Sequence, residues 1–226
     1  PDPSTFAGAL AVLEQYHLLG RTSPAVRTYL QAGAAGQHPE TPKPGDPLFQ
    51  RVQYSIIGNN YAAVAAAAEE ARRQGFHAAP MSNFIQGEAR LVAHKIASLA
   101  DSLSHNVGLL QRPIAIVMGG ETTVTIRGNG LGGRNQELAL AIALEIRNYP
   151  DLLIACFATD GNDGPTDAAG AFVDGQTVAR AAALGLDAQV YLDNNNSYPF
   201  FQALDDLILT GPTNTNVNDL ILLLAR

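Results

Sequence analysis

Several residue types are scarce in this chain, and each scarcity excludes a class of protein. A single cysteine, Cys156, rules out an internal disulfide framework and a zinc site built from cysteines. Lysine and arginine number 14 against 21 aspartates and glutamates, so the basic surface that neutralises nucleic-acid phosphates is missing. No uninterrupted apolar run approaches the ~18 residues that cross a bilayer, and no signal peptide is recognisable. We therefore expect a cytoplasmic protein that binds neither nucleic acid nor membrane.

What the chain does contain predicts an α/β fold, a layered mixed β-sheet flanked by helices. Its 226 residues, 46% of them apolar, suffice for one or two domains with a sizeable core. Residues 52–105 alternate as strand, helix, strand and helix, and the strand predicted at 152–161 buries Cys156 as an inert core residue. Further strands are predicted at 113–120, at 121–128 and on both sides of a polar loop in 206–225, with helices at 134–146, 175–185 and 197–204.

The first 45 residues form a segment of their own. Ser4 or Thr5 can cap one helix, and a second helix follows with Ser23 as its cap, Pro24 at its first position and Gly33 at its end. The segment QHPETPKPGDPLF then places four prolines in thirteen residues. This composition predicts an extended connector and a domain boundary.

The stretch RGNGLGGRNQELALAIAL, residues 127–144, contains a G-x-G-x-x-G pattern before a predicted helix. In a dinucleotide-binding turn the preceding strand is buried on both faces, whereas TTVTIR alternates between polar and apolar residues. The acidic residue about 20 positions further on, Asp151, precedes the next strand instead of ending it. No G-x-x-x-x-G-K-[ST] pattern occurs. These features argue against an NAD(P) site and exclude a P-loop.

The same stretch remains a candidate anion site. Gly132 and Gly133 allow the backbone to approach a ligand closely, and free N–H groups at the start of the helix favour negative charge. Arg134 stands at that start, where its planar guanidinium suits a phosphate or a carboxylate. The alternative is a glycine-rich hairpin tip with a solvated arginine.

Three further polar segments each follow a predicted strand: MGGETT, ATDGNDGPTDAAG and TGPTNTNVND. If these strands are parallel neighbours, the segments converge on one site beyond the carboxyl ends of the strands. Asp160, Asp163 and Asp167 are oxygen donors of the kind that Mg²⁺ prefers alongside substrate phosphates. The side chains that could donate to phosphate or sugar oxygens are Thr122, Thr123, Thr213, Thr215 and Asn216. Each segment taken alone is equally well explained as a capped turn.

Together, the segments GGETTVTIRGNGLGGRNQELALA, ATDGNDGPTDAAGA and LTGPTNTNVNDLILLL resemble the signature segments of the MOFRL domain. That is the C-terminal domain of the bacterial and archaeal glycerate 2-kinase family. The segments from PDPSTFAGAL to IIGNN resemble the part of those enzymes just before that domain, so the resemblance covers nearly the whole chain. It implies that residues 1–45 are a helical segment and connector from the preceding domain, 46–110 a linking region and 111–226 the MOFRL domain.

The resemblance also implies an activity, the ATP-dependent and Mg²⁺-assisted phosphorylation of D-glycerate in a cleft between two domains. Members of the family are about twice this length, so a missing N-terminal domain of the same protein would complete that cleft. The sequence leaves a homodimer open. Two other interpretations also stay open. One is an NAD(P)-dependent hydroxypyruvate reductase, the older name of the family, and the other is a phosphate-ligand-binding module that is inactive when isolated.

Carried onto this sequence, the motifs assign roles to individual residues. Arg134 and Asp160 are the expected catalytic residues, and Asp160, Asp163 and Asp167 are the expected Mg²⁺ ligands. Substrate or phosphate binding is expected of Glu121, Thr122, Gly132, Gly133, Asn135, Thr213 and Asn216. Where many members have Asn-Asp-Ser-Tyr, this chain has Asn195-Asn196-Ser197-Tyr198. The missing carboxylate argues against a metal role for that loop.

Overall fold

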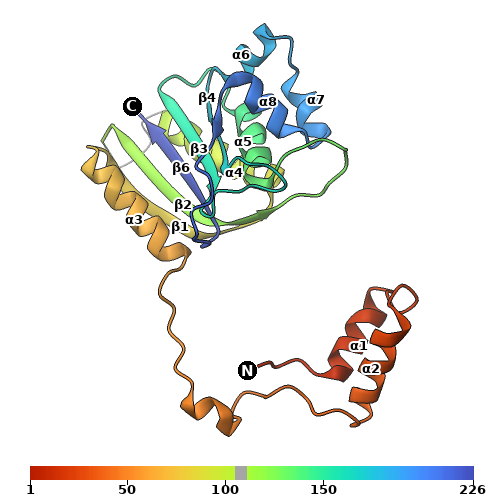
Figure 1. Ribbon diagram of the computed structural model, residues 1–226. Coiled ribbons are helices and arrows are strands. Elements are labelled where there is room, and N and C mark those ends of the chain that lie inside the picture. The colour runs from red at the N-terminus through yellow and green to blue at the C-terminus, as the bar shows by residue number, and fades with distance from the viewer. Residues whose placement is uncertain (105–110) are drawn as a thin grey trace. The chain divides into compact units, whose positions relative to one another are not determined.

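The computed structural model describes residues 1–104 and 111–226, and the chain divides into two compact units, residues 1–56 and 57–226 (Figure 1). The first unit contains helices α1 (Phe6–Gln15) and α2 (Pro24–Ala34) and the 3₁₀ helix η1 (Pro47–Arg51). Thr5 and Ser23 cap the two α-helices, which confirms the predicted starts. Helix α2 ends at Ala34, one residue after Gly33, where its end was predicted. Gly33 lies buried within the helix, where an added Cβ would be 2.4 Å from the ring of Phe6.

The strand predicted to begin at Val52 is absent. Residues 52–59 have no regular structure, and Tyr54 and Ile57 are almost entirely exposed. A strand needs a neighbour to satisfy its backbone groups, and no strand in the described residues pairs with this segment. The prediction is wrong because a short apolar run carries no information about whether a partner strand exists.

The second unit is a mixed sheet with helices on both faces, which confirms the predicted fold class. The described residues form strands β1 (His77–Glu88), β2 (Ile114–Thr123), β3 (Leu152–Ala158), β4 (Gly170–Asp174), β5 (Leu207–Ile208) and β6 (Asp219–Ala225). The helices are α3 (Asn60–Arg73), α4 (Ala89–Ser104), α5 (Arg134–Glu145), α6 (Thr177–Ala183), α7 (Ala188–Asp193) and α8 (Ser197–Leu204). Within the described ranges, no helix is long and apolar enough to cross a bilayer.

The strand order is β1-β2-β6-β3-β4-β5. Strands β1 and β2 are parallel, and every other neighbouring pair is antiparallel. The predicted domain limit at 110/111 borders residues that lie outside the described ranges. Strand β1 precedes this limit and the other strands follow it, yet all of them belong to one sheet.

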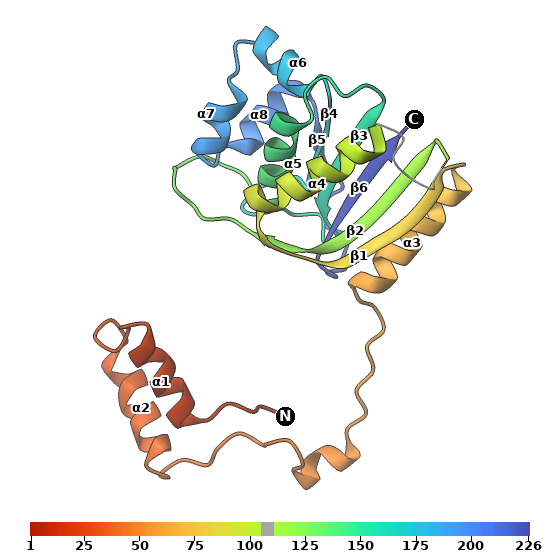
Figure 2. The same cartoon turned by 180° about the vertical axis from the view of Figure 1, so that it is seen from behind.

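Side-chain alternation along the strands builds a core layer on each face of the sheet. Helix α3 covers one face, and α4 and α5 cover the other (Figure 2). Along β2, Ile116 and Met118 belong to the larger layer under α4 and α5, whereas Val117 packs with Val64 of α3. Cys156 is fully buried in the larger layer, and this burial raises the pKa of its thiol, as expected for an inert core residue.

The two strands predicted at 113–120 and 121–128 are one strand, β2, which ends at Thr123. Gly120 has a φ of 152°, and an added Cβ there would lie 2.1 Å from the carbonyl oxygen of Ile85. Only glycine lets β2 pass this closely to the irregular part of β1. Beyond Thr123, residues 124–133 form no helix or strand. The short elements β4 and α7 were not predicted, since each is too short to show a period.

The register of the sheet brings three separate segments to one edge. Strands β2 and β3 run in the same direction because both pair antiparallel with β6, which lies between them. Asp219, the first residue of β6, is level with Gly120 of β2 and with Ala158 of β3. The polar segments that follow β2 and β3 and precede β6 therefore meet, although their strands are not the parallel neighbours that the sequence suggested.

Burial along β3 generates a prediction about stability. Ile154 is fully buried in the larger core layer, while its neighbour Leu153 is 37% exposed. Replacing Ile154 by alanine leaves a cavity, so we expect the free energy of unfolding in urea to fall by about 2–5 kcal/mol. Leu153→Ala is the matched control and should cost less than about 1 kcal/mol. Equal losses for the two variants would contradict the described layering.

Candidate functional site

A cavity of about 480 Å³ opens where the polar segments meet. We call it the β2–α5 cavity, because the end of β2 and the start of α5 form part of its wall. Its lining residues are Glu121, Thr122, Thr123, Val124, Ile126, Gly130, Gly132, Gly133, Arg134, Glu137, Gly164, Pro165 and Asn195. Five residues predicted to form the site are among them: Glu121, Thr122, Gly132, Gly133 and Arg134.

Arg134, the residue predicted to bind an anion, is held by carboxylates of the protein itself. Its Nε donates to Asp219 Oδ2 at 2.6 Å, and its Nη2 donates to Asp219 Oδ1 at 2.8 Å. The third nitrogen, Nη1, lies 3.4 Å from Glu121 Oε1. The hydrogen bonds to Asp219 raise the pKa of Arg134 above its usual value, and burial opposes this effect. The guanidinium is thus permanently charged and fixed in orientation, and Nη1 is the nitrogen that is not bonded to Asp219.

Asp219 was missed by the sequence reasoning. It is buried at the start of β6, and Asn60 Nδ2 donates to its backbone carbonyl at 3.0 Å. A buried carboxylate requires a cationic or hydrogen-bonding partner, and the bidentate Arg134 supplies it. The available signal was an acidic residue at the junction between the polar loop TGPTNTNVND and the apolar strand LILLLA.

The N-terminal amides of α5, predicted to be free for an anion, are occupied by Asp163. The Asp163 carboxylate accepts from Asn135 N at 3.1 Å and from Gln136 N at 2.9 Å, and the side chain of Asn135 donates to it at 3.2 Å. That prediction is wrong for these two amides, because the protein carries its own anion at the helix start. Burial raises the pKa of Asp163 to about 6, although the hydrogen bonds from Gln136 and Asn135 oppose the shift.

The glycines of the 127–133 stretch make close contacts within the protein. An added Cβ would lie 2.2 Å from Ser197 Oγ at Gly132, and 2.3 Å from Asp163 Cγ at Gly133. At Gly130 it would lie 2.4 Å from the Cβ of Asn196. The close approach expected at Gly132 and Gly133 was to a ligand, whereas the groups approached here belong to the turn around Asp163 and the start of α8. The glycines therefore have a packing role that needs no ligand.

Three consecutive asparagines support the segment that carries these glycines. Asn195 Oδ1 accepts from Arg127 N at 2.8 Å and from Gly128 N at 3.0 Å. Asn194 Oδ1 accepts from Asn129 N at 3.1 Å, and Asn196 Oδ1 accepts from Leu131 N at 2.9 Å. An aspartate in place of Asn196 would accept the same hydrogen bond. The departure from the family pattern at this position is therefore compatible with an unchanged structural role.

Asp160, Thr213 and Asn216 form a second cluster outside the cavity lining. Asn216 Nδ2 donates to Asp160 Oδ2 at 3.1 Å, and Thr213 N donates to the carbonyl oxygen of Asp160 at 3.1 Å. Thr213 Oγ1 also donates to the carbonyl oxygen of Thr159 at 2.5 Å. These contacts fasten the loop before β6 onto the turn after β3, as expected for polar segments that meet at one edge.

The three aspartates predicted to bind Mg²⁺ do not gather into one metal-binding group. Asp163 is buried against the start of α5, Asp167 accepts from Tyr198 Oη at 2.8 Å, and Asp160 contacts Asn216. In the described residues, no group of three histidine, cysteine or carboxylate side chains could hold a metal ion. The three aspartate side chains therefore contact three different parts of the protein: the start of α5, Tyr198 and Asn216.

Several buried polar atoms beside the cavity have no hydrogen-bond partner within the described part of the chain. They are Thr122 Oγ1, Asn135 Oδ1, Gln136 Oε1 and Ser197 Oγ. Buried polar groups are normally satisfied by protein, water or ligand. Thr122 is itself in the cavity lining.

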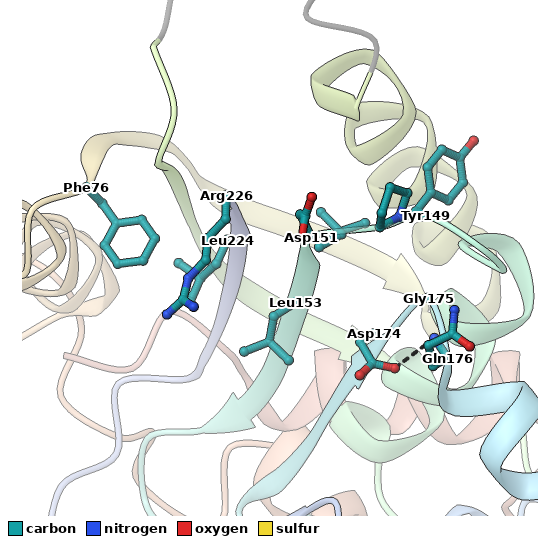
Figure 3. Close-up of a pocket in the computed structure, with 11 residues that line it drawn as sticks. Phe76, Tyr149, Asp151, Leu153, Asp174, Gly175, Gln176, Leu224 and Arg226 are labelled. Atoms are coloured by element: carbon teal, nitrogen blue, oxygen red, sulfur yellow. Dashed lines mark hydrogen bonds between the residues drawn. The ribbon is translucent and has the colours of Figure 1, made fainter.

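A second cavity, of about 430 Å³, lies at the opposite end of the same strands (Figure 3). Leu153 at the start of β3 and Leu224 near the end of β6 line it, together with Tyr149, Asp151 and other residues. None of the predicted site residues lines this cavity. The seven residues of β6 separate the two ends of the sheet by roughly 20 Å. The β2–α5 cavity is therefore the candidate site.

Fold and cavity together define a class of protein, an α/β domain with a cavity beyond the ends of its central strands that charged and apolar residues line together. Residues 114–219 match the MOFRL family. The chain is 41% identical over 223 residues to the D-glycerate 2-kinase of Thermotoga maritima. It is 39% identical over 222 residues to the glycerate 2-kinase of Pyrococcus horikoshii. Each match covers 98% of this chain and 50% of the relative, so the chain spans about half the length of these relatives.

A solved structure agrees with this relationship. The crystal structure of glycerate kinase from Thermotoga maritima has a TM-score of 0.81 and 40% sequence identity, covering 100% of this chain and 51% of that one. Residues 114–219 form a domain of the MOFRL family, and the chain is homologous, along nearly its whole length, to one half of the glycerate kinases.

The buried carboxyl of Asp163 predicts a pH dependence of stability. Its pKa is about 6 in the folded chain against an ordinary value of 3.8, so between these values the folded state holds a proton that the unfolded state has released. The free energy of unfolding should therefore rise as the pH falls from 7 to 4. Urea unfolding across this range should show a weaker rise in Asp163→Asn.

The pKa of Asp206 is also raised by burial, but Asp206 is present in both proteins and cancels in their comparison. Parallel curves for the wild type and Asp163→Asn would show that Asp163 ionises normally in the folded chain.

Proposed function

We propose that this chain forms one half of a glycerate 2-kinase, which transfers the γ-phosphoryl group of ATP to D-glycerate. Two observations carry the proposal jointly. The chain is related along 98% of its length to proteins named glycerate 2-kinase. Five of the residues expected to form the site line one cavity.

Phosphoryl transfer depends mainly on positioning and on the neutralisation of negative charge. Arg134 stands in the cavity wall, and its Nη1 would hold the carboxylate of glycerate or a phosphate of ATP. An anionic ligand would displace Glu121 from this nitrogen, since both are acceptors for the same donor. Thr122 belongs to the same lining, and its buried hydroxyl, which has no hydrogen-bond partner among the described residues, would donate to the ligand. Together these groups would orient the substrate.

Mg²⁺ would neutralise the phosphates of ATP when it is bound with the nucleotide. Of the three expected ligands we set Asp163 aside, because its carboxylate is buried and both of its oxygens accept hydrogen bonds from the start of α5. Asp160 and Asp167 stay candidate ligands. One or two carboxylates beside substrate phosphates are a common ligand set for this ion. The three-carboxylate site does not fit the geometry of the described residues.

The remainder of a protein twice this length is the partner that we propose for residues 1–56. Helix α1 has no buried residue, and α2 buries only Gly33. Val12, Tyr16, Val26 and Tyr29 are large apolar side chains that this helix pair leaves exposed. Exposed apolar surface of this kind marks an interaction site, and a second copy of the chain is the alternative occupant.

Activity assays separate the proposed kinase from its alternatives. The intact protein that carries this chain should release ADP from ATP only when D-glycerate is present, as measured in a coupled assay. Consumption of NADH or NADPH with hydroxypyruvate, without ADP release, would instead favour the reductase. Calorimetric titration of this chain alone with ATP-Mg²⁺ and with D-glycerate tests the third interpretation. No heat with either ligand would favour a module that is inactive when isolated.

Replacement of Arg134 tests its role in the reaction. We expect Arg134→Ala in the intact protein to lower kcat/KM for D-glycerate at least ~100-fold, the scale of losing a preorganised charge partner. Arg180→Ala is the matched control, because Arg180 makes a similar bidentate contact with the buried Asp206 but lies outside the cavity lining. Activity of Arg134→Ala within threefold of the wild type, or equal losses in both variants, would remove Arg134 from the mechanism.

A further inference from the structure

The cavity wall formed by residues 124–133 is held in place by hydrogen bonds from side chains elsewhere in the chain. It contains no helix or strand, yet Val124, Ile126, Gly130, Gly132 and Gly133 all face the cavity. Its N–H groups at four positions are bonded to side chains of the asparagines that precede α8. The shape of the wall thus depends on groups about 65 residues away in the chain, as the sequence separations of these bonds show.

Asn195 differs from its two neighbours because it also binds a buried ion pair. Its Nδ2 donates to Glu137 Oε2 at 2.7 Å, and the other carboxylate oxygen of Glu137 accepts from Arg90 Nε at 2.8 Å. Glu137 is only 2% exposed, so this carboxylate depends on both donors. Arg90 is further fixed by donating to the carbonyl oxygen of Leu192 at 2.6 Å. A chain of contacts therefore runs from α4 through α5 to the cavity wall.

The Glu137 carboxylate determines which way the amide of Asn195 faces. A carboxylate accepts and never donates, so the NH₂ group of Asn195 must point to it. The carbonyl oxygen is then directed at the N–H groups of Arg127 and Gly128. The backbone of Asn195 has a φ of 52°, in the left-handed region that asparagine tolerates better than most residues.

We propose that Asn195 is a positioning residue, which acts with Glu137 and Arg90 to hold the wall 124–133 in the shape that binds substrate. The kinetic consequence rests on the proposed function, whereas the structural consequence can be measured without any substrate. This role differs from that of a catalytic residue, since Asn195 acts through the wall and not on a reacting atom.

An exchange of amide and carboxylate tests the contact between Asn195 and Glu137. Asn195→Asp keeps the acceptor for the wall but places a second carboxylate against Glu137. Glu137→Gln, with its amide oxygen kept toward Arg90, places an NH₂ group against the NH₂ group of Asn195. This clash favours a rotated Asn195 amide, whose oxygen no longer faces the wall. The double variant restores one donor facing one carboxylate, keeps an acceptor for Arg90 and leaves the total charge unchanged. Both single variants should therefore be impaired, and the double variant should recover.

Hydrogen exchange at the amides of Arg127 and Gly128 is the direct measurement. We expect each single variant to exchange at least about tenfold faster than the wild type there, and the double variant to return to within about threefold. Asn194→Ala is the matched control. It removes an acceptor for Asn129 alone, so its effect should centre on Asn129. Unchanged exchange in the single variants, or no recovery in the double variant, would overturn the inference.

Kinetics of the intact protein separate positioning from a general loss of structure. The single variants should raise KM for D-glycerate by about tenfold with a smaller change in kcat, and the double variant should restore KM. Partial unfolding would lower kcat at constant KM and would count against the inference. If a single variant does not fold, recovery of folding by the double variant becomes the test, and failure to recover overturns it. A wild-type protein without kinase activity would overturn the proposed function, and the exchange measurement would still decide the role of Asn195.

Discussion

The ion pair between Arg134 and Asp219 is the contact on which the geometry of the candidate site depends. Asp219 lies at the start of the central strand β6, buried between the ends of β2 and β3. Burying its charge is costly without a partner, and Arg134 satisfies both carboxylate oxygens in a bidentate arrangement. Because Arg134 is the first residue of α5, the same contact fixes the start of that helix against the edge of the sheet.

The first four residues of α5 form hydrogen bonds with four other segments of the chain. Arg134 binds β6, and Asn135 and Gln136 bind Asp163 of the turn after β3. Glu137 binds Arg90 of α4 and Asn195 of the loop before α8. The polar motif thus joins most of the segments that surround the cavity. It also means that the charged groups beside the cavity are already paired within the protein, so an anionic ligand has to compete with Glu121 for Arg134.

The predictable parts of this protein are those that depend on neighbours in the chain. The cap at Thr5, the helix that begins at Arg134 and the buried strand around Cys156 all follow from local spacing and composition. The prediction of a strand from Val52 was wrong because a strand needs a partner strand, and the spacing of apolar residues does not reveal one. The prediction of free amides at the start of α5 was wrong for a similar reason, since their partner is distant in the sequence. Asp163, which occupies them, lies 28 positions away from Asn135.

The order of residues alone determined where polar segments follow apolar strands and that Arg134 stands at the start of a helix. Only the tertiary structure decided which carboxylate meets which donor. The cause is the position of β6 between β2 and β3, which brings Asp219 to Arg134 across 85 positions of sequence. The packing of α7 and α8 against α5 brings three asparagines to a segment about 65 positions away. Such pairings depend on strand order and register, which result from the packing of the whole sheet and not from any short stretch of sequence.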